Sequence, residues 1–95
     1  MDSGDGAAVI RLRLRPGVEW QHVDDEVILL DLRSSAYLAV NDTGAVLWPM
    51  VTAGTTEPEL VEELAGRFPI PVEQAQADVA TFVSRLRSLT LVEED

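Results

Sequence analysis

Apolar and polar residues alternate through the N-terminal half of the chain, as they do in half-buried strands. Residues 10–15 alternate apolar side chains with arginines, and residues 18–23 follow after a turn signal at Pro16 and Gly17. The run VILLDL at 27–32 is almost wholly apolar and has the length of a central strand. Residues 35–40 alternate again after a gap short enough for a hairpin. These segments predict a small antiparallel meander.

The spacing of apolar residues changes to three and four in the second half, which predicts three helices. The first follows three candidate N-cap residues, Asn41, Asp42 and Thr43, and Gly54 is a candidate C-cap. Pro49 lies inside this helix, where it should kink it or limit it to little more than two turns.

The other two helices have clear boundaries. Thr56 and Glu59 fit a capping box for the second, and prolines at 69 and 71 end it near residue 68. The third spans 72–89 with an apolar stripe, and Leu91 and Val92 offer a last short strand or an extended tail. The pattern predicts an α+β fold of winged helix-turn-helix type, a three-stranded antiparallel sheet followed by three helices.

Length and composition indicate a single domain. The chain has 95 residues, of which 46% are hydrophobic, so we expect a flexible tail over residues 1–7 and one folded unit over 8–95. The start of the chain is acidic and glycine-rich rather than basic and apolar, and no apolar run approaches the ~20 residues of a membrane span. We therefore expect a cytoplasmic protein with no membrane contact.

Charge and residue types exclude several functions. The formal net charge is -10, which repels phosphate backbones and disfavours nucleic acid as a partner. The chain has no cysteine and one histidine, so thiol chemistry is excluded and the usual metal sites have almost no ligands, and we expect no cofactor. The acidic cluster at 24–26, with Asp31, could supply paired carboxylates or cation ligands, but a solvated turn explains it more simply. The sequence thus predicts a protein that is not an enzyme.

Backbone groups remain as a means of binding. An open three-stranded meander has edge strands, and an edge strand offers unpaired N–H and C=O groups to an extended peptide. If strand 35–40 is such an edge and the third helix packs beside it, the two enclose a groove suited to peptide addition. The other possibility is that the chain's own terminus covers this edge, and composition does not decide between the two. The alternative function, from another class of protein, is an acidic winged-helix regulator. We expect Trp48 to be a core residue rather than a binding residue.

The order of these elements resembles a known family. VILLD at 27–31, AYLAVNDTGAVLW at 36–48, Gly54 and DVATFVSRLRSLTLV at 78–92 resemble the PqqD-like proteins, also called RiPP recognition elements. The resemblance implies a non-catalytic domain that captures the leader segment of a ribosomally made precursor peptide. The leader adds as a strand to the third strand of the sheet and lies against the third helix.

Carried onto this sequence, the resemblance places peptide-binding residues on both elements. On the strand they are Ser35, Ala36, Tyr37, Leu38, Ala39 and Val40, and on the helix they are Ala75, Asp78, Val79, Phe82, Arg85 and Leu86. Phe82 and Leu86 are expected to anchor an apolar residue, and Asp78 and Arg85 to orient polar groups. Alternation shows only that Tyr37 and Leu38 face opposite ways.

Within the family, the Trp48 and Pro49 pair and the short acidic chain look most like the stand-alone recognition proteins of lasso-peptide biosynthesis. Those proteins work beside a separate leader peptidase and an ATP-dependent cyclase. The alternative is a PqqD-type protein that presents a precursor to a radical-SAM enzyme in quinone-cofactor biosynthesis. Residues 10–15 lie outside the matched region, so their role stays open.

Overall fold

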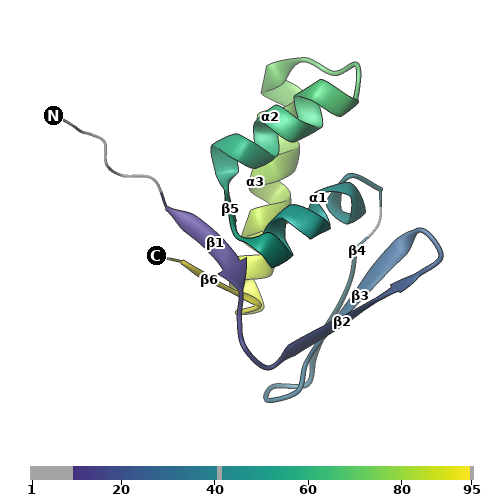
Figure 1. Ribbon diagram of the computed structural model, residues 1–95, viewed down its shortest axis with the longest axis vertical. Coiled ribbons are helices and arrows are strands. Elements are labelled where there is room, and N and C mark those ends of the chain that lie inside the picture. Colours follow the sequence, from purple (N-terminus) through teal and green to yellow (C-terminus); the bar gives the residue numbers. More distant parts are fainter. Residues whose placement is uncertain (1–9, 41, 95) are drawn as a thin grey trace, which may run out of the picture.

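Two small sheets and three helices make up the fold (Figure 1), which the computed structural model describes over residues 10–40 and 42–94. In chain order the elements are β1 (Arg11–Leu14), β2 (Val18–Val23), β3 (Glu26–Asp31), β4 (Ala36–Val40), α1 (Asp42–Ala53), β5 (Thr55–Thr56), α2 (Glu57–Arg67), α3 (Val72–Ser88) and β6 (Val92–Glu94). This is the predicted α+β architecture with a winged-helix-like order. The predicted tail, residues 1–7, lies outside the described residues.

The larger sheet is an antiparallel meander in the order β2-β3-β4. A two-residue turn at Asp24 and Asp25 joins β2 to β3, and Asp24 has a φ of 56°. The turn from β3 to β4 ends at Ser35, with a φ of 62°, so Ser35 precedes the strand in which the sequence had placed it. Aspartate tolerates this left-handed region better than most residues, which suits the first turn.

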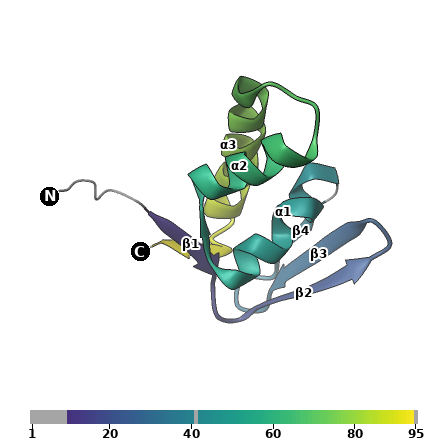
Figure 2. The same cartoon turned by 45° about the horizontal axis from the view of Figure 1, so that its top comes forward.

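The three helices lie on one side of the β2-β3-β4 sheet in both views (Figures 1 and 2). Strand residues that point to this side are buried, among them Val27, Leu29 and Leu38. Residues on the other face, such as Leu30 and Tyr37, are exposed. The alternation seen in the sequence therefore separates a covered face from an open face.

Trp48 lies at the centre of the core, as predicted. Its side chain is 0% exposed, and its ring meets the partly exposed Trp20 edge to face with centroids 5.9 Å apart. That geometry suits the charge distribution of two aromatic rings. The contact between Trp20 and Trp48 thus packs β2 against α1.

The arginine strand belongs to a second sheet, in the order β5-β1-β6. Leu12 is buried while Arg13 faces outward and lies 3.6 Å from Glu93 on the neighbouring strand. Arg15 donates to the Thr90 carbonyl at 3.1 Å. The structure therefore shows that β1 pairs with β5 and β6 and takes no part in the β2-β3-β4 sheet.

Helix α1 is longer than the position of Pro49 suggested. It continues beyond the proline to Ala53, so the limit of little more than two turns is wrong. Proline costs one backbone donor, but Leu47, Trp48 and Val51 around it are almost fully buried, and this burial offsets the loss. Gly54 follows with a φ of 90°, as expected of a residue that ends a helix. The candidate cap Asn41 lies outside the described residues.

The capping box of α2 is confirmed. The Thr56 hydroxyl accepts from the Glu59 N–H at 3.3 Å, and a Glu59 carboxylate oxygen accepts from the Thr56 N–H at 3.1 Å. At the far end of α3, Arg87 donates to Glu94 at 2.6 Å and to Glu57 at 3.0 Å. Burial disfavours its charge, but hydrogen bonds and attraction from Glu94 and Glu57 raise the pKa of Arg87. This network ties α3 to β6 and to the start of α2.

Candidate functional site

Strand β4 is an open edge of the β2-β3-β4 sheet. It pairs with β3 on one side, and no strand pairs with its other side within residues 10–40 and 42–94. An edge of this kind leaves N–H and C=O groups available for another strand.

The register shows which backbone groups of β4 face outward. The Leu32 N–H donates to the Gly17 carbonyl at 3.3 Å, so the backbone groups of Leu32 point toward β2. Backbone groups of successive strand residues point to opposite sides, so those of Asp31, Leu29 and Val27 point toward β4. Their partners there are Ala36, Leu38 and Val40. It follows that Tyr37 and Ala39 direct their backbone groups to the open edge.

The two-residue turn at the other end of β3 supports this assignment. Such a turn is closed by a hydrogen-bonded pair, here Val23 opposite Glu26. Counting in steps of two from Glu26 again directs Ile28 and Leu30 toward β2 and leaves Val27 and Leu29 for β4. Two separate observations thus agree on the same pair of open residues.

Side chains of β4 divide between two faces. Leu38 is 6% exposed and packs in the core, whereas Tyr37 is 62% exposed on the open face of the sheet. Val40 shares the face of Leu38 and marks where β4 meets α1 and α3. The alternatives left open by the sequence are therefore separated: Leu38 points to the helix side and Tyr37 away from it.

A cavity of about 370 Å³ lies between the end of β4 and α3. We call it the β4–α3 groove, and its lining residues are Val40, Thr43, Gly44, Asp78, Thr81, Phe82 and Arg85. Gly44 allows the first turn of α1 to approach closely, since a Cβ there would lie 2.2 Å from Cγ1 of Val40 and 3.2 Å from Cε1 of Phe82. A side chain at this position would therefore force Val40, Phe82 or the start of α1 to move.

The residues that the sequence placed on α3 separate into two rows. Asp78, Phe82 and Arg85 line the groove. Ala75, Val79 and Leu86 are completely buried in the core and have no exposed surface. The rows lie on neighbouring stripes of one helix, as a period of 3.6 residues requires.

Three groove residues, Thr43, Gly44 and Thr81, were not anticipated from the sequence. One signal was present for Gly44, since glycine early in a helix is unfavourable by roughly 1 kcal/mol relative to alanine and so suggests a close approach. The two threonines gave no comparable signal.

The groove carries opposite charges at its two ends. Asp78 accepts a hydrogen bond from Nε2 of Gln74 at 2.9 Å. Arg85 is exposed, and within the part of the chain that the structure describes no hydrogen bond or ion pair engages its guanidinium. Phe82, partly buried, lies between them in sequence and packs against the core.

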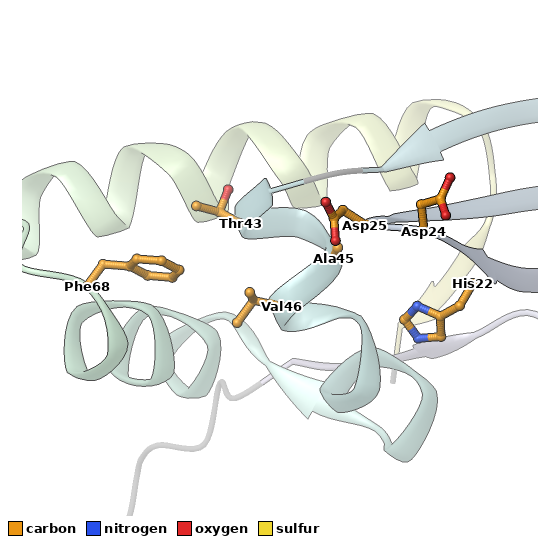
Figure 3. A pocket seen from close by; sticks show the side chains of 7 residues that line it. All are labelled: His22, Asp24, Asp25, Thr43, Ala45, Val46 and Phe68. Carbon is orange, nitrogen blue, oxygen red and sulfur yellow. The ribbon is translucent and has the colours of Figure 1, made fainter.

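A second cavity, of about 480 Å³, opens between the β2–β3 turn and the helices (Figure 3). It is lined by His22, Asp24, Asp25, Thr43, Ala45, Val46 and Phe68. Figure 3 shows the two aspartates on the hairpin side and Phe68 across from them, with Val46 of α1 between. Thr43 lines both cavities, so they lie at the same end of α1.

Asp31, one of the acidic residues considered for catalysis, has a structural role in a turn. Asp31 accepts from the Arg33 N–H and the Ser34 hydroxyl, each at 3.0 Å, and so closes the β3–β4 turn. The backbone hydrogen bond from Arg33 is the main cause that lowers the pKa of Asp31, and burial opposes it. Among the described residues, no three His, Cys, Asp or Glu side chains gather closely enough to hold a metal ion.

The helices in the described part of the chain are too short or too polar to span a membrane.

Comparison with known proteins identifies the family. The sequence pattern of PqqD, described as coenzyme PQQ synthesis protein D, matches residues 26–92. This chain belongs to the PqqD family. The matched segment contains β4, α1 and α3, and hence every residue of the β4–α3 groove. A comparison with curated proteins gives no match.

Two solved structures share this fold of the PqqD family over most of their length. One is described as TbiB1 in complex with the TbiA(beta) leader peptide, with a TM-score of 0.78, 25% identity, and coverage of 85% of this chain and 94% of that chain. The other is lasso peptide synthetase B1 complexed with the leader peptide, with a TM-score of 0.76, 27% identity, and coverage of 86% and 96%. In both, the relative of this protein is bound to a leader peptide.

Proposed function

We propose that this protein is a non-catalytic module that binds the leader of a ribosomally synthesised precursor peptide by strand addition to β4. The observation that carries the proposal is the open edge of β4, where Tyr37 and Ala39 present backbone groups beside the β4–α3 groove. Both similar structures contain a leader peptide, which gives the class of ligand. An extended leader would pair with β4 and place alternate side chains toward α3.

The energetics suit a transient complex. Two outward residues offer about four hydrogen bonds at a net ~0.5 to 1.5 kcal/mol each. One or two apolar anchors add ~1.5 to 3 kcal/mol each. With the upper values of these terms and the lowest cost of association and ordering, about 8 kcal/mol remains, which is a micromolar dissociation constant. Backbone pairing supplies affinity, and the groove side chains must supply the choice of sequence.

The proposed setting is lasso-peptide maturation in the cytoplasm, where the bound leader would be presented to a separate leader peptidase and to an ATP-dependent cyclase. The similar structure described as lasso peptide synthetase B1 favours this setting. A PqqD-type role beside a radical-SAM enzyme is the second candidate, favoured by the family match. The reading frames next to the gene distinguish them: a short precursor with a peptidase and a cyclase supports the first, and a radical enzyme supports the second.

Titration calorimetry with the cognate leader peptide tests the binding function. We expect one leader to bind per chain with a dissociation constant in the micromolar range or below. Absence of any heat of binding with the leader peptide at tens of micromolar would count against the proposal. A gel shift with DNA at low salt tests the regulator alternative, because DNA binding by a protein weakens steeply as salt rises.

A further inference from the structure

Among the residues that the structure describes, the charge at the Arg85 end of the β4–α3 groove has no partner. The other six arginines are distributed elsewhere, and several donate within the fold, as Arg87 does to Glu94 and Arg15 does to Thr90. Within the described residues, the guanidinium of Arg85 makes no such contact. Its position beside Phe82 means that a peptide lying in the groove would cover it.

Covering an unpartnered guanidinium removes water from a charged group, and this costs free energy unless the peptide supplies acceptors. A carboxylate meets the need best, because its two oxygens match the fork of N–H donors and form a charge-assisted pair. From this geometry, and resting on the proposed leader-binding function, we infer that the leader presents an aspartate or glutamate to Arg85 and an apolar side chain to Phe82.

The spacing on α3 gives the spacing in the leader. Phe82 and Arg85 are three residues apart, which is a rise of about 4.5 Å along a helix. Residues on one face of an extended peptide are about 6.6 Å apart, two positions along the strand. The long arginine side chain covers the difference. The leader should therefore carry its carboxylate two positions from the apolar residue that contacts Phe82.

Asp78 gives the pattern a direction. It lies at the opposite end of the groove from Arg85, and its carboxylate already accepts from Gln74. A leader carboxylate placed at that end would meet a like charge, which is unfavourable. The acidic residue must then follow the apolar residue in the direction from Asp78 to Arg85. Reversing the two positions should weaken binding even though the composition of the leader is unchanged.

Calorimetry with matched variants on both sides tests this inference. On the peptide, each acidic residue of the cognate leader is replaced in turn by its amide; on the protein, Arg85→Gln is compared with Arg67→Gln. Arg67 is the matched control because it is paired with Glu63 on α2, away from the groove. We expect one amide peptide to bind the unmodified protein at least about tenfold more weakly. Arg85→Gln should bind the original leader with the same loss and show no further loss with that amide peptide, while Arg67→Gln should bind as the unmodified protein does.

A charge exchange gives a second readout. Arg85→Glu should lose affinity for the original leader and regain it with a leader that carries lysine at the identified position. The inference is overturned if every amide peptide binds within about twofold of the original leader, or if Arg85→Gln binds that leader unchanged; the proposed function would then stand. If the original leader does not bind the unmodified protein, both the function and the inference fall. Thermal unfolding of each variant checks the fold, which we expect to be unaffected because Arg85 is exposed.

Discussion

A Cβ atom on Gly44 would lie 2.2 Å from Cγ1 of Val40, closer than two carbon atoms can approach without a shift. Gly44 belongs to the first turn of α1 and Val40 to the end of β4, so this contact fixes where the helix meets the edge strand. The same Cβ would lie 3.2 Å from the Phe82 ring on α3. The absence of a side chain at Gly44 thus allows the three elements that form the β4–α3 groove to pack closely together.

Gly44→Ala should destabilise the protein and weaken leader binding. Alanine favours a helix by roughly 1 kcal/mol, but the clash with Val40 costs about 1 to 3 kcal/mol and displaces either Val40 or the helix start. We expect a net loss of about 1 kcal/mol, seen as a fall in Tm of about 5 °C.

Gly66→Ala is the control for this substitution. Gly66 lies in α2, and nothing is within 4 Å of a Cβ added there. Only the helix preference remains, so Tm should rise rather than fall. Equal shifts of both variants in the same direction would mean that the close approach of Gly44 has no energetic consequence.

Tyr37→Pro should impair binding more than it impairs folding. The N–H of Tyr37 points to the open edge, so its loss breaks no bond to β3, and proline is tolerated on edge strands. We expect the variant to remain folded and to bind the leader about two- to tenfold more weakly, the effect of one hydrogen bond, or worse if the ring hinders pairing. Circular dichroism and calorimetry give the two readouts.

Two variants set the limits of that experiment. Tyr37→Phe keeps the backbone donor and should bind the leader as the unmodified protein does. Leu38→Pro removes a donor that points to β3 and disturbs a buried residue, and it should unfold the protein. Unfolding by Tyr37→Pro to the same extent as by Leu38→Pro would contradict the assignment of the Tyr37 N–H to the open edge.

The sequence predicted those features of the fold that depend on neighbours along the chain. The capping box of α2 follows from Thr56 and Glu59, three residues apart, and strand β4 follows from the alternation over 36–40. The second sheet was missed, because β1 pairs with Thr55 and Thr56 on one side and with residues 92–94 on the other. Pairings so distant in sequence leave no local pattern.

The groove was predicted less completely than the edge strand. A helical stripe locates one side of α3, but where the core ends and the groove begins depends on how closely α1 packs. For this reason the sequence groups Val79 and Leu86 with Phe82, whereas in the structure both are fully buried. The identity of Arg85 as an unpartnered charge required the positions of all the acidic side chains around it.

Asp31→Asn should reduce the dependence of the free energy of unfolding on pH. The folded state lowers the pKa of Asp31 from its ordinary value of 3.8, chiefly through the Arg33 N–H. A lowered folded pKa contributes stability that is complete above the unfolded pKa and is lost as pH falls through the folded pKa. Urea unfolding at pH 7, 5 and 3 should show the unmodified protein more stable than the variant at pH 7 and the difference shrinking at pH 3. A difference that stays constant with pH would contradict this role of the carboxylate.

Arg87→Gln should loosen the contact between α3, β6 and α2. Arg87 donates to both Glu94 and Glu57, but the side chain is 41% exposed, so the loss is limited to about 1 kcal/mol at low salt. Urea unfolding should show this loss diminishing as salt is added, since exposed charges are screened. Arg67→Gln removes a single exposed pair and should cost less than half as much. Equal losses for the two variants would show that the bridging contact adds nothing.

Amide hydrogen exchange of β4, followed by NMR with and without saturating leader peptide, tests strand addition most directly. In the free protein the amides of Leu38 and Val40 should be protected by β3, while those of Tyr37 and Ala39 should exchange rapidly. In the complex, Tyr37 and Ala39 should become protected by at least about tenfold, with Leu38 and Val40 as internal references. Unchanged exchange of Tyr37 and Ala39 in a saturated complex would contradict strand addition to β4.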